Sequence, residues 1–326
     1  MRELSQDEAL NEALASTLST DNRVLALECT LESESPSAIW QNLLSKYSGQ
    51  QVKSTPGSPA TLVGIATGAA IAGLKPVLRF HSPAQLLAGC QFLTSTLGRI
   101  PTITNNNLDA PAVIIAPSGP GLPFGTQHDI ALESILSNIP DILVIYVSGA
   151  YEMKGCLLAA IQEERPVIIL ESPLLRDKKE NVPETDYILS FDETPLLHSG
   201  QDLTLLAWGY NVKRALNISN ELENSNIQCD VINIRTLNHL DLGTIANSVQ
   251  KTHRVAIIED DFSIGSFGGQ LSAKIQKEFF SQINHPIERF SFWKGTPHYL
   301  PHLDECDKSF TENCILELRK SLERKI

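Results

Sequence analysis

The sequence predicts two doubly wound α/β domains in succession, each built around a mostly parallel sheet. Its 326 residues are about twice the usual length of a single domain. Short apolar runs alternate with segments of helical period, which is the rhythm of a parallel sheet with crossover helices. A polar stretch at 173–199, which contains three prolines, interrupts this rhythm. We therefore predict a first domain at 1–172, a linker at 173–199 and a second domain at 200–326.

The first domain is expected to begin with a helix at 6–20, where apolar residues recur at helical spacing. Further helices are predicted at 37–47, 60–73 and 151–161, with a turn at 55–59. Short apolar runs predict buried strands at 24–27, 76–80, 112–116, 142–147 and 167–170. The helix at 60–73 carries Gly64 and Gly68. Because glycine costs about 1 kcal/mol inside a helix, this four-residue spacing indicates close packing against a neighbour.

The second domain repeats the alternation. Its strands are predicted at 203–207, 229–234 and 255–259, and its helices near 211–223, 241–251, 266–280 and 316–326. A glycine-rich loop at 264–270 follows the last strand and precedes a helix. This position is typical of a turn that cradles an anion, and equally of a simple glycine turn.

Composition excludes several classes of protein. A net charge of −12 with dispersed lysines and arginines argues against a nucleic-acid surface, and no apolar run reaches the roughly 18–20 residues that span a bilayer. The six cysteines contain no CxxC pair, which argues against a zinc site or a disulfide framework. The first residues have neither a signal core nor a presequence pattern. We expect a bacterial cytoplasmic protein, or an organellar matrix protein whose presequence has been removed.

Two residues stand where ligands of parallel sheets usually bind. His128 ends a Gly/Pro-rich loop at 117–128 that leaves the strand at 112–116, and ligands bind beyond the carboxyl ends of such strands. A histidine there can act as an acid or base, or simply bond a backbone carbonyl. Glu28 follows the strand at 24–27, either as an active-site carboxylate or as a solvated glutamate.

Five segments, taken in order, carry a family resemblance: 55–56 with 64–76, 117–128, 159–172, 230–237 with Asp241, and Glu259 ahead of the glycine loop. In this order they resemble the β subunits (E1β) of thiamine-diphosphate-dependent 2-oxo acid dehydrogenases, of the pyruvate, branched-chain or acetoin type. Such subunits join a transketolase-like pyrimidine-binding domain to a transketolase C-terminal domain. The similarity runs over essentially the whole chain, and its collinearity makes it specific.

The resemblance implies a shared active site. An α subunit would hold the cofactor's diphosphate and Mg²⁺ in an α₂β₂ assembly. The enzyme would decarboxylate a 2-oxo acid and pass the acyl group to lipoamide on an E2 acyltransferase. Glu28 matches a carboxylate near the thiazolium and His128 a histidine that serves acyl transfer. Gly57, Pro59, His81, Gln85 and His128 fall at cofactor-binding positions, while the backbone carbonyls of Ala160 and Glu163 match a monovalent-cation site, such as one for K⁺.

The chain departs from the family at the pyrimidine end of this site. The glutamate that normally holds the pyrimidine N1′ is replaced by Pro59, which can neither exchange a proton nor donate a backbone bond. No carboxylate lies between Glu34 and Asp109 to replace it. Gln85 stands at the aromatic position, and Arg79 and His81 accompany it. His239, where a proline is usual, is a lesser change.

Three interpretations of the chain follow. The first is an E1β subunit with a modified pocket. The second is a catalytically impaired E1β paralogue with an assembly or regulatory role. The third is a half-chain of a split transketolase or a deoxyxylulose-phosphate synthase, which would need a separate diphosphate-binding half that this chain does not supply.

Overall fold

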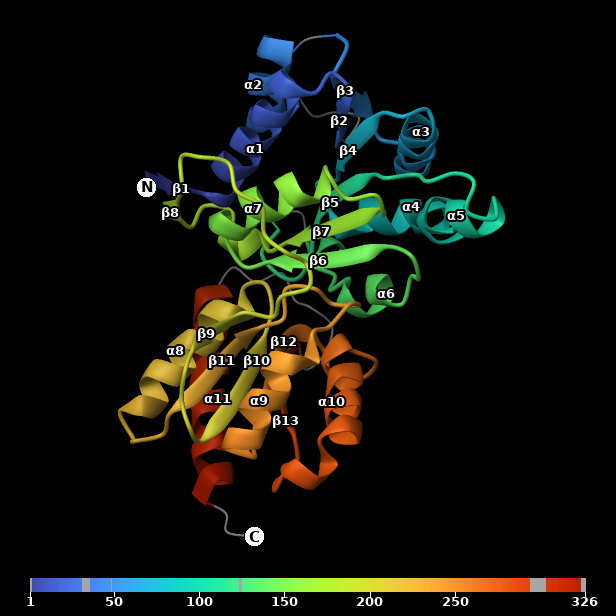
Figure 1. Ribbon diagram of the computed structural model, residues 1–326. Coiled ribbons are helices and arrows are strands. Elements are labelled where there is room, and N and C mark those ends of the chain that lie inside the picture. Colours follow the sequence, from blue (N-terminus) through green and yellow to red (C-terminus); the bar gives the residue numbers. More distant parts are fainter. Residues whose placement is uncertain (1, 31–35, 48, 123–124, 294–302, 324–326) are drawn as a thin grey trace. The chain divides into compact units, whose positions relative to one another are not determined.

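The computed structural model describes residues 2–30, 36–47, 49–122, 125–293 and 303–323. The chain divides into two compact units (Figure 1). The first unit contains residues 1–118 and 135–191, and the second contains 119–134 and 192–326. The loop that carries His128 therefore groups with the second unit. The domain boundaries predicted from the sequence, with a linker between a first domain at 1–172 and a second at 200–326, stay a prediction.

The first unit is built on a parallel sheet of six strands in the order β3-β2-β4-β5-β7-β6. The sequence predicted five of them and the parallel arrangement. The strands are β2 (Val24–Thr30), β3 (Val52–Pro56), β4 (Lys75–Arg79), β5 (Val113–Pro117), β6 (Leu143–Val147) and β7 (Val167–Glu171). A separate antiparallel pair joins β1 (Arg2–Leu4) to β8 (Glu180–Val182).

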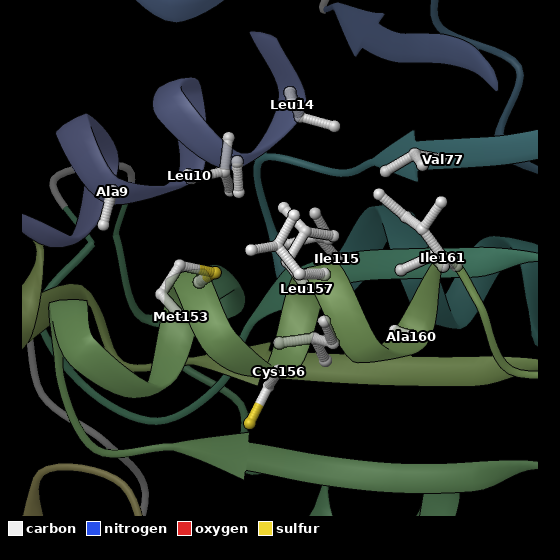
Figure 2. Packing of buried hydrophobic residues seen from close by; sticks show 14 of the residues in the cluster. Ala9, Leu10, Leu14, Val77, Ile115, Met153, Cys156, Leu157, Ala160 and Ile161 are labelled. Carbon is white, nitrogen blue, oxygen red and sulfur yellow. The ribbon is translucent and has the colours of Figure 1, made fainter. Parts of the chain in front are cut away.

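Helix α1 (Gln6–Thr20) forms as its sequence predicts. Ser5 caps it, and Ser5 and Glu8 form a capping box in which each side chain bonds the other's backbone N–H. Its apolar face packs on α7 (Ala150–Ala160) in the main core of the unit. Figure 2 shows Leu10 and Leu14 of α1 beside Met153 and Leu157 of α7. The other helices of this unit are α2 (Ala38–Tyr47), α3 (Pro59–Ile71), α4 (Pro83–Ser95) and α5 (Ile100–Ile103), with short 3-10 turns at Leu97–Arg99 and Pro173–Leu175. Helix α6 (Glu133–Ser137) begins in the second unit and ends in the first.

The turn predicted at 55–59 is wrong in part. Strand β3 continues to Pro56, and Pro59 already begins α3. Proline is well placed at the first position of a helix, because its missing N–H would have no partner there. Helix α4 begins with Pro83 in the same way and was not predicted, since its sequence lacks a clear helical period.

Gly64 and Gly68 of α3 do not pack closely against another described part of the chain. A Cβ added at Gly64 or Gly68 would meet no described atom within 4 Å. Both residues are exposed, as are Ile65 and Ile71 on the same helix. The packing that their spacing indicates is therefore not an internal one among the described residues.

The second unit is built on a sheet in the order β13-β12-β10-β11-β9, with β9 antiparallel to its neighbour β11. Its strands are β9 (Leu196–His198), β10 (Leu203–Ala207), β11 (Cys229–Asn233), β12 (Val255–Phe262) and β13 (Glu288–Trp293). Its helices are α8 (Asn211–Glu223), α9 (Leu242–Thr252), α10 (Phe267–Glu278) and α11 (Leu303–Glu323), with 3-10 turns at Thr126–His128 and Phe280–Gln282. In the described part of the chain, no helix combines the length and apolarity needed to cross a membrane.

The glycine loop at 264–270 cradles an anion that belongs to the chain itself. The Glu259 carboxylate accepts the backbone N–H of Gly268 at 2.9 Å and the hydroxyl of Ser266 at 2.9 Å. Arg289 pairs with the same carboxylate at 3.0 Å. The loop therefore binds an anion, but this anion is the carboxylate of Glu259 rather than an external ligand.

Candidate active site

Glu28 is a fully buried carboxylate near the carboxyl end of β2. Its side chain is 0% exposed, which excludes the interpretation as a solvated glutamate. Ser37, just before α2, donates to Oε1 through its hydroxyl and through its backbone N–H at 3.3 Å. Ser54 of β3 donates its hydroxyl to Oε2 at 3.3 Å. The segment before α2 and strand β3 therefore both hold this carboxylate in place.

His81 is the third partner of Glu28. It lies two residues after the end of β4, and its Nε2 lies 2.8 Å from Glu28 Oε1. Because β2 and β4 are adjacent parallel strands with Glu28 opposite Arg79, residues just beyond the end of β4 reach the Glu28 side chain. The His81 side chain is 18% exposed. The pair therefore joins a buried carboxylate to an imidazole that reaches the surface.

The charge state of Glu28 follows from these contacts. Burial by itself would raise the pKa of this carboxyl group, but the hydrogen bonds from His81 and Ser37 outweigh burial and hold the pKa below its usual value. Glu28 is therefore ionised near neutral pH and only accepts hydrogen bonds. The Nε2 atom of His81 must then carry the hydrogen in this contact.

Gln85 bridges β2 and β4. Its Oε1 accepts the backbone N–H of His81 at 2.8 Å, and its Nε2 donates to the Cys29 carbonyl at 3.4 Å. Gln85 is buried on the first turn of α4. Both ends of its amide are thus committed within the chain, so that Gln85 orders the backbone around His81.

Gly57 and Pro59 lie where β3 leads into α3. A Cβ at Gly57 would stand 3.1 Å from the Thr30 carbonyl oxygen, so a larger residue there would press on the end of β2. The Pro59 carbonyl lies close to α4, where a Cβ at Gly89 would meet it at 3.4 Å. The structure thus gathers Glu28, Gly57, His81 and Gln85 at the ends of β2, β3 and β4, beside the start of α3.

Arg79 forms a second buried network that the sequence analysis did not identify. Its guanidinium is 2% exposed and pairs with Glu171 at 3.2 Å and with Asp7 at 2.8 Å. Arg176 pairs with Glu171 at 3.1 Å. Burial would raise the pKa of Glu171, but the two guanidinium groups outweigh it and lower that pKa. The cation of Arg79 is therefore neutralised by its own carboxylates and does not replace the missing N1′ partner.

His128 belongs to the second unit. It ends the short turn Thr126–His128, and its backbone N–H donates to the Gly125 carbonyl at 3.0 Å. The neighbouring Asp129 is buried and accepts the backbone N–H of Leu122 at 3.2 Å. Burial raises the pKa of Asp129. The catalytic role of His128 stays a prediction.

The predicted cation residues Ala160 and Glu163 line a small cavity of about 30 Å³ in the first unit. Lys75 and Val113, which begin β4 and β5, also line it, so it lies at the opposite edge of the sheet from Glu28. The Ala160 carbonyl accepts the Glu163 N–H at 3.3 Å, and the Glu163 carboxylate accepts from Arg165 at 2.9 Å. The cavity is large enough for one water molecule or ion, and the cation assignment stays a prediction.

A larger cavity of about 720 Å³ lies in the second unit. Its described lining includes Phe262, Arg289, Trp293 and Phe310 and none of the predicted site residues. Within the described ranges, no three His, Cys, Asp or Glu side chains come together as a metal site.

Comparison with known proteins places the chain. Residues 2–176 match the transketolase pyrimidine-binding domain, and residues 192–307 match the transketolase C-terminal domain. These two matches define a transketolase-type α/β protein of two domains.

Two relatives match this chain over most of its length. The chain is 30% identical to the pyruvate dehydrogenase E1 component subunit beta of Rickettsia felis, over 86% of both chains. It is 32% identical to the chloroplastic subunit beta-2 of Arabidopsis thaliana, over 93% of this chain and 75% of that one. The chain belongs to the family of pyruvate dehydrogenase E1 β subunits, as its sequence predicted.

Solved structures agree on the fold. A split gene transketolase, described as an inactive beta4 tetramer, superposes with a TM-score of 0.78 over 98% of both chains at 18% identity. The transketolase of Campylobacter jejuni gives a TM-score of 0.68 at 13% identity, over 98% of this chain and 47% of that one. At these identities the likeness concerns the fold alone.

With the thiamine diphosphate of this family, the gathered residues would make a changed set of contacts. Glu28 is present, buried and ionised. Pro59 offers no polar side chain and no N–H, and Gln85 is bonded to the chain's own backbone. Beside them, His81 is the group with a polar ring at the surface. The fit therefore rests on Glu28 and His81.

Proposed function

We propose that the chain is the β subunit of a pyruvate dehydrogenase-like E1 enzyme, which decarboxylates a 2-oxo acid and transfers the acyl group to lipoamide. The observation that carries the proposal is Glu28: a buried, ionised carboxylate held by Ser37, Ser54 and His81 at the ends of parallel strands. A buried charge is costly unless a structure is built around it. Such preorganised carboxylates are characteristic of active sites.

In this proposal the cofactor is thiamine diphosphate, whose diphosphate and Mg²⁺ an α subunit holds. When bound, it supplies the electron sink for decarboxylation. This chain would contribute Glu28 near the thiazolium, and Gly57, Pro59, His81 and Gln85 around the pyrimidine. His128 would serve acyl transfer, and K⁺ would occupy the cavity at Ala160 and Glu163.

The proposed assembly is α₂β₂, together with an E2 acyltransferase that carries the lipoyl group. The exposed face of α3 supports a contact with another subunit, because Gly64 and Gly68 leave open space beside the exposed side chains of Ile65 and Ile71. An exposed apolar helix face of this kind is typical of an interaction site. The compartment would be a bacterial cytoplasm or, after removal of a presequence, an organellar matrix.

Calorimetry tests the proposal directly. Thiamine diphosphate and Mg²⁺ are titrated into this chain mixed with its α partner, and binding heat is expected at micromolar cofactor. Mass spectrometry of the intact complex would show the α₂β₂ stoichiometry. No binding heat at cofactor concentrations well above micromolar would overturn the enzyme proposal.

A second candidate function is a catalytically impaired paralogue that serves assembly or regulation. Pro59 at the N1′ position favours it, as does the commitment of Gln85 to backbone bonds. In that case the heterotetramer would form, yet exchange of the cofactor's thiazolium C2 hydrogen would be no faster than in free cofactor. General acid–base assistance is typically worth 10²–10⁴ in rate, so Pro59→Glu is expected to accelerate exchange. No change in this variant would mean that the pyrimidine position no longer matters.

A further inference from the structure

We propose that His81, oriented by Glu28, is the acid–base residue of the pyrimidine end and holds there the proton that the missing N1′ carboxyl group would hold. This inference rests on the proposed function and deepens it. It gives His81, just beyond β4, the role that a glutamate at the position of Pro59 has in the family.

The geometry supports the assignment in two ways. Nε2 of His81 lies 2.8 Å from Glu28 Oε1, and the ionised carboxylate accepts the Nε2 hydrogen. Nδ1 makes no hydrogen bond to the part of the chain that the structure describes, and the side chain is 18% exposed. One ring nitrogen is thus anchored inside, while the other remains available to a ligand.

The backbone of His81 is also held in place. The His81 backbone N–H donates to Gln85 Oε1 at 2.8 Å, and Gln85 Nε2 in turn bonds the Cys29 carbonyl of β2 at 3.4 Å. Helix α4, which carries Gln85, packs against α3 where Gly89 approaches the Pro59 carbonyl. His81 is therefore tied to the same group of elements that brings Pro59 to this end of the sheet.

The chemistry balances as a single proton transfer. With Nδ1 protonated, the imidazolium is stabilised by the Glu28 carboxylate, as in a carboxylate-oriented histidine base. The Nδ1–H bond of His81 would break as its proton passes to the bound pyrimidine, and the neutral ring that remains would keep its hydrogen on Nε2, donated to Glu28 Oε1. No other reactant is needed.

Other charged groups near the ring are already committed. Glu28 on β2 accepts hydrogen bonds from Ser37, Ser54 and His81. Arg79 on β4 is paired with Asp7 and Glu171. Both groups are thus engaged within the chain, whereas the His81 Nδ1 makes no hydrogen bond to the described residues.

The test compares His81→Gln with the wild type in the complex with the α partner. Glutamine's amide nitrogen can keep the bond to Glu28, while nothing at the Nδ1 position can titrate. Cofactor affinity by calorimetry should change little, but C2 hydrogen exchange should fall about 100-fold or more. Added imidazole should restore part of the exchange rate. His239→Gln, at an exposed position of the second unit, is the matched control and should behave as wild type.

A measurement independent of activity completes the test. In the full chain labelled with ¹⁵N-histidine, the His81 signal should show hydrogen on Nε2, and Glu28→Gln should remove this preference. A neutral ring with its hydrogen on Nδ1 would overturn the inference, as would His81→Gln exchanging at the wild-type rate. That last result would leave the E1 function standing. A wild-type complex that neither binds the cofactor nor accelerates exchange would overturn the proposed function and this inference with it.

Discussion

Two buried glutamates, one in each unit, occupy similar places and differ in their partners. Glu28 on β2 and Glu259 on β12 are both 0% exposed on parallel strands. Each accepts a serine hydroxyl from the residue that precedes the next helix, Ser37 or Ser266. Glu259 then pairs with Arg289 at 3.0 Å, whereas Glu28 pairs with His81 at 2.8 Å.

We call Glu259 with Arg289, Ser266 and Ser291 the clamp. The choice of partner separates this structural cluster from the candidate active site at Glu28. The guanidinium of Arg289 is permanently charged and cannot exchange its proton in this pH range, so the Glu259 cluster has one stable state. The imidazole of His81 can gain or lose a proton. In our proposal, a buried glutamate therefore supports stability in one unit and proton chemistry in the other, according to its arginine or histidine partner.

The largest expected effect comes from Gly268→Ala in the clamp. The added Cβ would stand 2.3 Å from Glu259 Oε2, and that carboxylate is held by Arg289, Ser266 and Ser291. We expect the free energy of unfolding to fall by about 3 kcal/mol in urea denaturation. Gly64→Ala is the matched control. It has open space and should stabilise the isolated chain by up to about 1 kcal/mol. Equal effects of the two changes would contradict the clamp.

Neutralising each glutamate sharpens the comparison. Glu259→Gln leaves Arg289 without its carboxylate and weakens three other hydrogen bonds, so a loss of about 2 kcal/mol in unfolding free energy is expected. Glu28→Gln should cost about 1 kcal/mol, because the glutamine amide can keep part of the hydrogen bonds to Ser37, Ser54 and His81. Urea denaturation of both variants at pH 7.5 measures the difference. A larger loss for Glu28→Gln would show that its cluster is the more structural one.

The sequence predicted those elements whose signal is local. Helices α1 (Gln6–Thr20) and α8 (Asn211–Glu223) and strand β10 (Leu203–Ala207) match their predicted ranges, because amphipathic period and short apolar runs are properties of the segment alone. Helix α4 was missed, since Gly89 and Cys90 interrupt its pattern. Strand β13 (Glu288–Trp293) was also missed, although alternating polar and aromatic residues mark it as an edge strand.

The sequence could place the candidate site residues at the ends of strands, but it could not predict the contacts between them. Glu28 and His81 were both placed beyond neighbouring strands, but their contact depends on the register of β2 with β4 and on side-chain rotamers across 53 residues of sequence. The Arg79–Glu171 pair spans 92 residues in the same way. The glycine loop at 264–270 remained open between two interpretations because its anion, Glu259, comes from the preceding strand.

The smallest effect is expected at Asp261, next to the clamp. Burial raises the pKa of this carboxyl group to about 6, and the charges of Glu259 and Asp260 add to the shift. The folded-state pKa thus exceeds the unfolded value of 3.8, so the charged form is penalised in the folded state. This penalty is absent below about pH 4, grows between about pH 4 and 6, and is complete above. Stability from this group is therefore lost as the pH rises.

Asp261→Asn removes the charge and should stabilise the chain by about 1 kcal/mol at pH 7.5, since part of the gain is offset by a weaker hydrogen bond from the Phe262 N–H to the neutral amide oxygen. At pH 4.5 the advantage should disappear or reverse, because wild-type Asp261 is then largely neutral. Unfolding free energies of variant and wild type at both pH values give the comparison. Asp177→Asn, on an exposed residue, should show no such dependence. A pH-independent difference for Asp261→Asn would mean that the clamp tolerates this buried charge, and that its acidic strand end is better solvated than its contacts indicate.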